Sequence, residues 1–392
     1  MKKHSNILIL SLFTLLLASC SKENVGIGGD ENVNENFNKS YILFDVDVAT
    51  RGTLIEDTIL KDNFYVIGYQ YRGDWNTYKV MATPNVFYKD QQSTQLALPQ
   101  TVTYNKGTNL YTYSPIQAWT GNSYSFFAYY PVISQNSPIV LFDDGTTLKQ
   151  GVPYITYTLP NSSDPRTLID VMTAKYIDTG IDFSPSVNLN MYHRLSGVDI
   201  SAHNYYKVDH DNNQDTPDID AIIKITNLKV DLENVNTVAK IYLDDSERVY
   251  SSPGKRSYQL VGNTGSADWS LSYIDIKPSN SNGDEGEGNN NIKETLITNP
   301  SSTSLILIPQ TNELSFKLAL TYQVGYYNNN QWVTLRTVNN SGANNLLSGT
   351  FNVPLTEGRR YYLDLTFTSD AVTISIDPAS EWVDKDVIHE FE

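Results

Sequence analysis

Few residues of this chain are of the types that carry out chemistry. The 392 residues include one cysteine and five scattered histidines. The sequence contains no His-Glu-x-x-His motif, no Gly-x-Ser-x-Gly elbow and no Walker loop. Asp178-Thr179-Gly180 matches half of an aspartic-protease site, but such a site needs a second carboxylate to share a proton. A β-turn is the better interpretation of this tripeptide, and we predict that the protein is not an enzyme.

One acidic loop has the spacing of a calcium site. Its alternating carboxylates and amide, with a further carboxylate at the twelfth position, are Asp209, Asp211, Asn213, Asp215 and Asp220. Alternating oxygen ligands can surround a hard cation such as Ca²⁺. However, Gln214 stands where an EF-hand has glycine, and Pro217 stands at the ninth position. A solvated loop between strands is the alternative, and no other cofactor is predicted.

The single cysteine stands at the end of an export signal. Met1-Lys2-Lys3 is basic, Ile7–Leu17 is largely apolar, and Leu17-Ala18-Ser19-Cys20 follows. This order is typical of a secretory signal, because a stretch of about 11 residues is shorter than the roughly 20 that span a membrane. The last four residues resemble a bacterial lipobox. We therefore predict a lipoprotein in which residues 1–19 are removed and Cys20 carries the lipid, palmitate included. An ordinary signal peptide with an incidental cysteine is the alternative.

Charge and composition exclude two further classes of protein. The formal net charge of −16 argues against nucleic-acid binding, which needs a basic surface. With 40% hydrophobic and 11% aromatic residues, the chain is too apolar to be wholly disordered. Its 27 tyrosines and 13 phenylalanines favour strands.

The elements that position these residues are predicted to be β-strands. Apolar side chains alternate with polar ones, which marks half-buried strands, and no sustained amphipathic helix occurs. The stretches chosen as strands are Tyr41–Val48, Phe64–Tyr69, Ser123–Tyr130, Val187–Leu195, Leu314–Tyr322, Tyr361–Phe367 and Val372–Ile376. Many strands separated by polar turns indicate an all-β protein made of β-sandwiches. We predict a flexible tether at 20–40, an N-terminal domain at 41–188 and a C-terminal domain at 189–392.

A candidate processing site follows the first predicted strand. Arg51 and Gly52 lie in the polar segment Ala49-Thr50-Arg51-Gly52-Thr53. An exposed arginine in such a segment is a target for a trypsin-like, arginine-specific protease. An ordinary surface arginine is the alternative.

Several segments together resemble one protein family. They begin with the lipobox at Cys20 and Ala49-Thr50-Arg51-Gly52, and the later ones are 119–131, 191–196, 305–310, 355–363, 372–376 and Glu381-Trp382. In this order they make the chain similar to the fimbrillin family, the shaft and accessory subunits of type V pili in Bacteroidota.

The resemblance implies a fold and an assembly route. It implies two transthyretin-like β-sandwich domains in tandem, export as a lipoprotein to the cell outer membrane, and assembly into a surface fimbrium. A trypsin-like protease would cut after Arg51 and remove Tyr41–Val48. A strand from another pilin subunit, taken from the equivalent of Val372–Phe391, would then fill the groove.

Three functional hypotheses remain at this point. The first is a pilin subunit, shaft or accessory, that supports adhesion. The second is a cell-surface glycan-binding lipoprotein that uses the aromatic residues Trp75, Trp119 and Trp332. The third is a secreted hydrolase, for which the sequence shows no recognisable acid–base or nucleophile arrangement.

Overall fold

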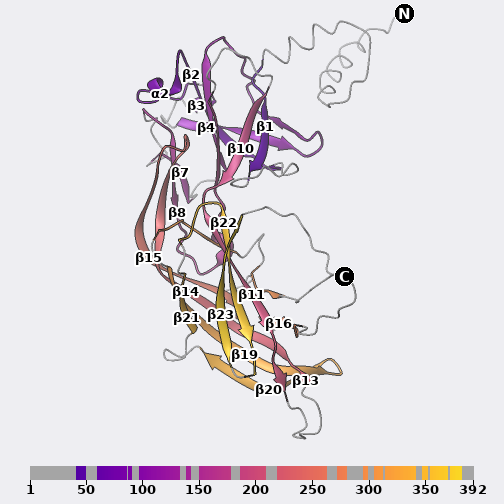
Figure 1. The fold of residues 1–392 in the computed structure, drawn as a ribbon. Helices are drawn as coiled ribbons and strands as arrows, with labels where there is room; N and C mark the ends of the chain where they lie inside the picture. Colours follow the sequence, from indigo (N-terminus) through magenta and orange to yellow (C-terminus); the bar gives the residue numbers. More distant parts are fainter. Residues whose placement is uncertain are drawn as a thin grey trace, which may run out of the picture.

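The protein is built almost entirely of strands, as its computed structural model shows (Figure 1). The structure describes residues 41–49, 60–85, 87–90, 97–132, 138–142, 150–177, 186–208, 219–262, 272–279, 295–298, 304–311, 314–340, 347–351, 354–369 and 371–381. The helices in these ranges are α2 (Trp75–Tyr78) and the 3₁₀ turn η1 (Pro165–Thr167). Neither is long and apolar enough to cross a membrane. The predicted all-β class is confirmed.

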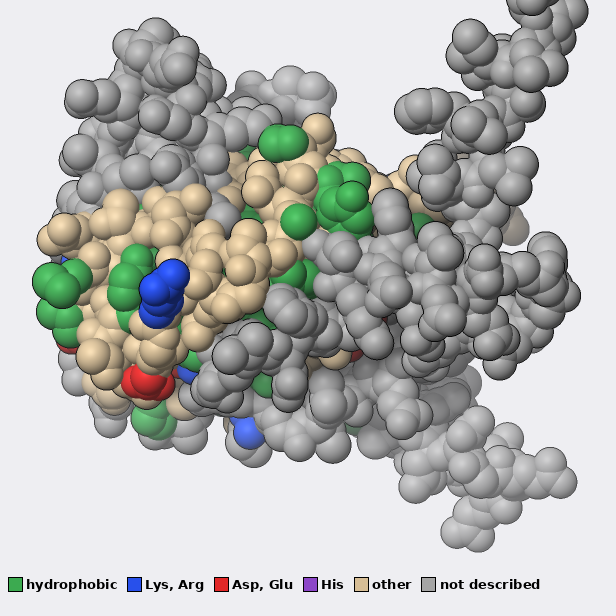
Figure 2. All heavy atoms as spheres, turned by 90° about the horizontal axis from the view of Figure 1, so that it is seen from above, with side chains coloured by type: hydrophobic (Ala, Val, Ile, Leu, Met, Phe, Trp, Pro, Cys, Tyr) green, Lys and Arg blue, Asp and Glu red, His purple; other side chains and the backbone are tan. Residues whose placement is uncertain are grey.

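The first sheet has eight strands in the order β1-β10-β9-β6-β2-β4-β3, with β5 paired to β4. Their bounds are β1 (Phe44–Ala49), β2 (Phe64–Tyr71), β3 (Tyr88–Asp90), β4 (Ala97–Asn105), β5 (Leu110–Thr112), β6 (Ser123–Tyr130), β9 (Met172–Ile177) and β10 (Val187–His193). All described neighbours pair antiparallel except β1, which runs parallel to β10. At the end of the molecule formed by this sheet, the described surface shows hydrophobic side chains and few charged ones (Figure 2).

This sheet is buried on both of its faces. Successive side chains of a strand point to opposite faces, so Phe126 and Phe127 of β6 enter two different cores. One, called here the small core, lies against β1 and contains Phe126 together with Ile42, Phe44, Val46, Leu60, Phe64, Val66, Phe87, Val102, Tyr124, Ala128, Met172, Ala174, Val187, Leu189 and Met191. The other, the large core, receives Phe127 and continues into the rest of the molecule.

The second sheet also has eight strands and is organised around one long strand. Its order is β20-β19-β14-β8-β7, with β15 and β16 also paired to β14 and β21 paired to β19. The bounds are β7 (Ile139–Leu141), β8 (Tyr154–Thr158), β14 (Ile222–Tyr242), β15 (Arg248–Val261), β16 (Ile274–Ile276), β19 (Leu314–Asn328), β20 (Gln331–Asn340) and β21 (Leu347–Phe351).

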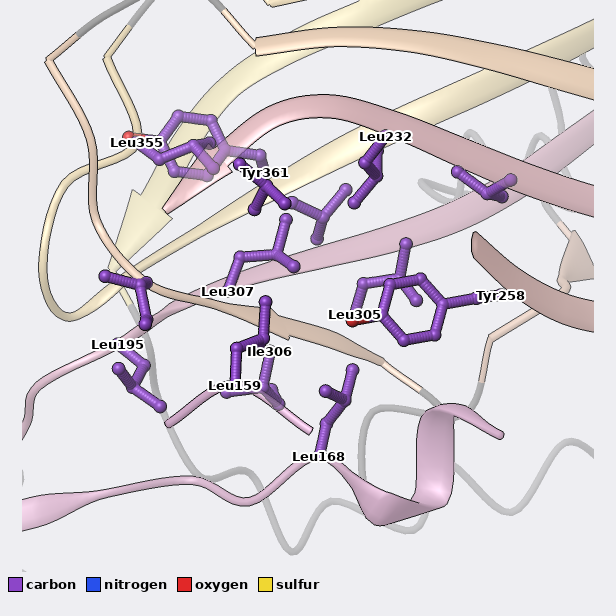
Figure 3. Packing of buried hydrophobic residues seen from close by; sticks show 14 of the residues in the cluster. Leu159, Leu168, Leu195, Leu232, Tyr258, Leu305, Ile306, Leu307, Leu355 and Tyr361 are labelled. Atoms are coloured by element: carbon purple, nitrogen blue, oxygen red, sulfur yellow. The ribbon is translucent and has the colours of Figure 1, made fainter. Parts of the chain in front are cut away.

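The third sheet packs across the second. Its order is β17-β11-β22-β23, with β18 paired to β11, and β12 pairs separately with β13. The bounds are β11 (Ser196–Asn204), β12 (Lys207–Val208), β13 (Ile219–Asp220), β17 (Thr295–Leu296), β18 (Leu305–Leu307), β22 (Arg359–Phe367) and β23 (Val372–Glu381). Leu232 of β14, Leu305 of β18 and Tyr361 of β22 share the interior between the two sheets (Figure 3). This sandwich is the main part of the large core.

Hydrogen bonding crosses the predicted domain boundary. β7 and β8 precede residue 188, yet β8 pairs with β14 from Val238↔Thr158 to Tyr242↔Tyr154. The parts on either side of residue 188 therefore share one sheet and one large core. The division into domains at 41–188 and 189–392 stays a prediction.

Candidate functional site

The first strand occupies an edge of the first sheet. Six residue pairs join β1 to β10 in parallel, from Phe44↔Val187 to Ala49↔Tyr192. The amide of Val187 donates to the carbonyl of Leu43 at 2.7 Å, and the amide of Ile42 donates to the carbonyl of Gln117 at 3.0 Å. Among the described strands, β10 is the only sheet partner of β1. Strand β1 is therefore attached along a single backbone edge.

Side chains of β1 alternate between the small core and solvent. Ile42, Phe44 and Val46 are 0%, 7% and 0% exposed, whereas Asp45 and Asp47 point outward and are exposed. Partial burial, and then the neighbouring charge of Asp45, raise the pKa of Asp47. The strand thus meets the protein through its apolar side chains and shows carboxylates to solvent.

An aromatic box surrounds the ring of Phe44. We give this name to four side chains whose ring centroids lie 5.3 Å (Phe87), 5.6 Å (Tyr113), 5.7 Å (Phe126) and 6.3 Å (Phe64) from that of Phe44. All four contacts are edge-to-face, the arrangement that aromatic quadrupoles favour. The hydroxyl of Tyr113 donates to the carbonyl of Ile42, so the box also holds the strand's backbone.

One wall of the box is built from unfavourable backbone. Phe87 has a φ of +56°, a conformation that bulky side chains rarely adopt. Its ring is 4% exposed and packs against Tyr113 at 4.9 Å and Phe126 at 5.4 Å. Such a conformation persists only where the surrounding structure enforces it, and it is common at binding sites.

The energy that holds β1 comes mainly from burial. Fully burying an aliphatic or phenylalanine side chain contributes about 1.5–3 kcal/mol, so Ile42, Phe44 and Val46 together contribute about 5–9 kcal/mol. The groove that these three side chains fill lies beside the edge of β10 that β1 occupies, and without β1 another strand could add there by backbone pairing.

The predicted processing residues fall outside the description. Cys20, Arg51 and Gly52 lie outside the described residues, and so do residues 1–40. Ala49, the last residue of β1, precedes Arg51 by two positions in the sequence. Lipidation and cleavage stay predictions.

Most of the predicted calcium loop is likewise undescribed. Asp209, Asp211, Asn213 and Asp215 lie outside the described ranges, whereas Asp220 belongs to β13 and pairs with Lys207 of β12. The described ranges contain no cluster of three or more His, Cys, Asp or Glu residues that could hold a metal. The calcium site stays a prediction.

The three tryptophans proposed for sugar binding have different environments. Trp75 is 2% exposed in the large core, and Trp119 packs against the small core with its ring 4.9 Å from that of Tyr124. Trp332 lies partly exposed on β20, with its ring 5.2 Å from that of Tyr327. Trp119 and Trp332 are both partly exposed, whereas Trp75 is buried.

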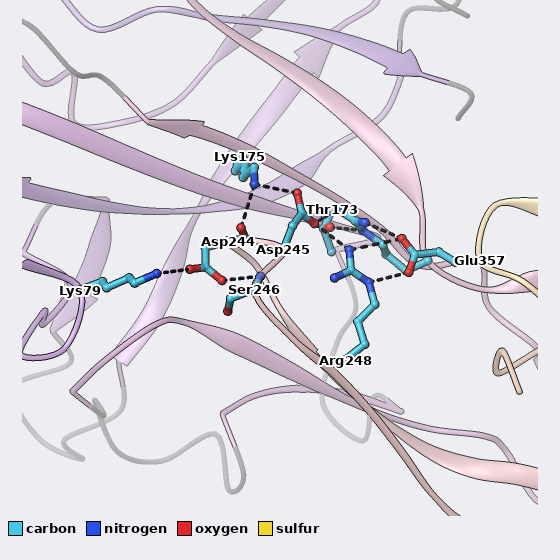
Figure 4. A network of polar contacts seen from close by, with 9 residues as sticks. Lys79, Thr173, Lys175, Asp244, Asp245, Ser246, Arg248 and Glu357 are labelled. Carbon is cyan, nitrogen blue, oxygen red and sulfur yellow. Dashed lines mark hydrogen bonds and ion pairs between the residues drawn. The ribbon is translucent and has the colours of Figure 1, made fainter. Parts of the chain in front are cut away.

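A network of ion pairs, which sequence reasoning missed, joins the sheets (Figure 4). We call it the polar junction, and its members are Lys175, Arg194, Asp245, Arg248 and Glu357. Arg194 donates to Glu357 at 2.5 Å and to Asp245 at 2.6 Å. Arg248 bonds both of these carboxylates, and Lys175 lies 3.0 Å from Asp245. The side chains of Arg194 and Glu357 are only 5% and 7% exposed. The network therefore connects β9, the turn between β10 and β11, β15 and the turn before β22 in a largely dry environment.

The charges of the polar junction determine the ionisation of Asp245. Burial alone raises the pKa of this carboxyl, but Arg194, Lys175 and Arg248 together outweigh burial and lower it. Beside the junction, Nδ1 of the buried His193 lies 2.6 Å from a carboxylate oxygen of Asp170. A signal for the junction was present in the sequence, since Arg194 and Glu357 lie in the segments 191–196 and 355–363.

The fold and the groove define a class: all-β proteins with stacked sheets and an edge strand seated in an aromatic cleft. The fimbrillin-like family model matches residues 73–379, which is most of the chain. The chain therefore belongs to the fimbrillin-like family, and the resemblance seen in the sequence is confirmed.

Two solved structures illustrate the likeness. One is a fimbrial protein from Bacteroides vulgatus, with a TM-score of 0.57 and 20% identity over 87% of this chain and 99% of that chain. The other is the tip fimbrial protein Mfa3 from Porphyromonas gingivalis, with a TM-score of 0.32 and 10% identity over 87% of this chain and 99% of that one. No curated protein matches the chain. The Bacteroides vulgatus structure supports the fold.

Proposed function

We propose that the protein is a structural subunit, shaft or accessory, of a cell-surface fimbrium that supports adhesion. The observation that carries the proposal is the position of β1: an apolar edge strand, held by one partner strand, directly ahead of Arg51. Membership of the fimbrillin-like family supports it.

In the proposed route, the lipid on Cys20 first anchors the subunit at the outer membrane. An arginine-specific, trypsin-like protease then cuts between Arg51 and Gly52. The first strand leaves, and a strand from another pilin subunit pairs with the free edge of β10. This route gives Cys20 only a temporary role, because the cut separates it from the rest of the subunit.

The subunit's own donor strand is proposed to lie between Val372 and Phe391. Within that segment, β23 already pairs with β22, and Val372, Ile374 and Ile376 pack against the large core. Withdrawing β23 would forfeit those contacts. We therefore place the donor in Trp382–Phe391, the part of the segment that follows β23.

The test is the variant Arg51→Ala, with Arg72→Ala as a matched control because Arg72 is exposed in a turn after β2. We expect Arg51→Ala to remain a lipidated monomer, while Arg72→Ala gives filaments whose subunits begin at Gly52. Electron microscopy of cell-surface filaments and N-terminal sequencing provide the readouts. Filaments of normal abundance from Arg51→Ala would contradict cleavage-gated assembly.

Lipidation and calcium binding have separate tests. Cys20→Ser should abolish metabolic labelling with palmitate, and labelling that persists would reject Cys20 as the lipid site. Calorimetry with millimolar Ca²⁺ on the mature protein tests Asp209, Asp211, Asn213, Asp215 and Asp220, and the absence of both heat and a thermal shift would reject the calcium site.

Glycan binding is a second candidate function, and one exposed aromatic group favours it. Tyr273 and Tyr327 are 48% and 40% exposed beside Trp332, and Lys224 lies 4.2 Å from the Trp332 ring centroid. Exposed aromatic groups of this kind mark binding sites. We expect Trp332→Ala to lose any binding seen on an oligosaccharide array, whereas no binding by the unmodified protein would reject this function.

A further inference from the structure

We propose that the groove selects its incoming strand by an aromatic side chain at the position of Phe44. This selection excludes the C-terminal segment of this chain, including that of a second copy, in favour of a strand from a different kind of subunit. The inference rests on the proposed exchange of the first strand. It adds the chemical identity of the partner strand and the residue by which it is recognised.

The aromatic box is the most demanding part of the groove. Four rings surround Phe44 at centroid distances of 5.3–6.3 Å, whereas the same core receives only aliphatic side chains from Ile42 and Val46. An incoming strand with a small residue at this position would leave a void lined by Phe64, Phe87, Tyr113 and Phe126. Such a void lowers the stability of a closely packed interior, because the lining atoms lose their van der Waals contacts on one side.

Two of the four walls of the box, Phe64 and Phe126, are also fixed in advance of any exchange. Phe126 lies in the middle of β6, which is paired on both sides, by β2 and by β9. Phe64 belongs to β2, which pairs with β4 and β6. Walls carried by central strands cannot close around a smaller residue without disrupting the sheet. The unfavourable backbone of Phe87 is consistent with a cavity shaped for a ring.

The neighbouring positions complete the recognition pattern. Ile42 and Val46 are 0% exposed, so the residues two before and two after the aromatic residue must be apolar. Asp45 is exposed, so the position between the aromatic residue and the second apolar one tolerates charge. The pattern is thus apolar, any, aromatic, any, apolar.

The chain's own C-terminal residues do not match this pattern. Aromatic side chains in 372–392 occur at Trp382 and Phe391, and β23 itself has none. With Trp382 in the box, Ser380 and Asp384 would fill the two apolar positions, whichever way the strand ran. With Phe391 in the box, His389 would fill one of them. Burying an unpaired carboxylate or imidazole costs several kcal/mol, so we assign the partner strand to a different subunit.

The experiment uses the full mature chain, nicked at Arg51 by limited trypsin digestion and checked by mass spectrometry. Arg51→Ala serves as the control that is not nicked there. Fluorescent peptides of residues 41–49 are added, and their capture is measured by anisotropy. The peptides carry the natural sequence, Phe44→Leu, Phe44→Ala, or Asp45→Ala as a matched control. A peptide of residues 382–392 represents the chain's own tail.

We expect the natural and Asp45→Ala peptides to be captured equally. Phe44→Ala should bind about 100-fold or more weakly, because it leaves the box empty. Phe44→Leu should bind about tenfold more weakly, because it fills most of the volume but loses the ring contacts. The 382–392 peptide should not be captured at concentrations that saturate the natural one.

Each contrary result has a distinct meaning. Equal capture of the Phe44→Ala or Phe44→Leu peptide overturns aromatic selection while leaving strand exchange intact. Capture of the 382–392 peptide as tightly as the natural one overturns the assignment to a different subunit. Retention of the first strand after nicking, or capture of no peptide at all, overturns the proposed exchange itself and the inference with it.

Discussion

The substitution Glu357→Gln is expected to destabilise the protein by about 3 kcal/mol. Glu357 is 6% exposed and accepts bonds of 2.5 Å from both Arg194 and Arg248. A hydrogen bond to a charged group contributes about 1.5–3 kcal/mol and a neutral one about 0.5–1.5 kcal/mol. Glutamine keeps the volume and one neutral acceptor but removes the charge that two arginines share. The estimate of about 3 kcal/mol also falls at the lower end of the range for breaking a buried ion pair.

Urea unfolding followed by circular dichroism measures this loss as a lower midpoint at an unchanged slope. Lys255→Gln is the matched control, because Lys255 pairs with Glu233 while its side chain is 79% exposed. Exposed pairs contribute about 0–1 kcal/mol, so this control should move the midpoint little. Added salt should leave the Glu357→Gln deficit nearly unchanged, since buried pairs are weakly screened.

The reasoning fails if Glu357→Gln unfolds at the same urea concentration as the unmodified protein. It also fails if the two variants lose stability equally, because burial would then make no difference to the value of an ion pair in this protein.

Two further predictions concern acid stability and close packing. The pKa of Asp245 is lowered on folding, so its contribution to stability is complete above the unfolded pKa of about 3.9 and is lost as the pH falls through the lower folded pKa. Urea unfolding measured from pH 6 to pH 2 should therefore show a smaller loss of stability with acid for Asp245→Asn than for the unmodified protein. An identical loss in the two proteins would reject the effect. Gly325→Ala should lower stability by about 1–3 kcal/mol, because an added Cβ would lie 2.1 Å from the Val333 carbonyl oxygen. Gly121→Ala, with a φ of +76° and nothing within 4 Å of the added carbon, should cost only about 1 kcal/mol, and equal thermal shifts for the two variants would show that crowding at Gly325 is unimportant.

Alternation along the chain predicted strands well where one face is buried. The predicted stretch Ser123–Tyr130 is β6 to the residue, and Tyr361–Phe367 lies within β22. Alternation identifies which side chains turn inward, because in a half-buried strand the apolar side chains lie on the face that is removed from water. It does not identify the neighbouring strand, since any apolar strand can cover the same face. The pairing of β8 with β14 and the parallel pairing of β1 with β10 therefore appear only in the structure.

In the functional regions too, local spacing was predictable and long-range contacts were not. Ile42, Phe44 and Val46 alternate with other residues in the predicted stretch Tyr41–Val48, and the structure places them in one core. The polar junction was not predicted, because Arg194 and Glu357 are 163 residues apart and meet only after three sheets have formed. Phe87 could not be placed either, since its positive φ follows from packing rather than from local preference.

One continuous segment carries both the edge of the groove and the central arginine of the polar junction, and this limits what the first strand's departure would disturb. Residues 187–204 form β10, turn at Arg194 and continue as β11. If β1 departs, β10 still pairs with β9 through Tyr192↔Thr173 and His193↔Met172. The amide of Arg194 still donates to the Val171 carbonyl at 2.7 Å, and its guanidinium still holds Asp245 and Glu357. None of these contacts involves β1, so they hold the C-terminal end of β10 and the turn at Arg194 when β1 is removed.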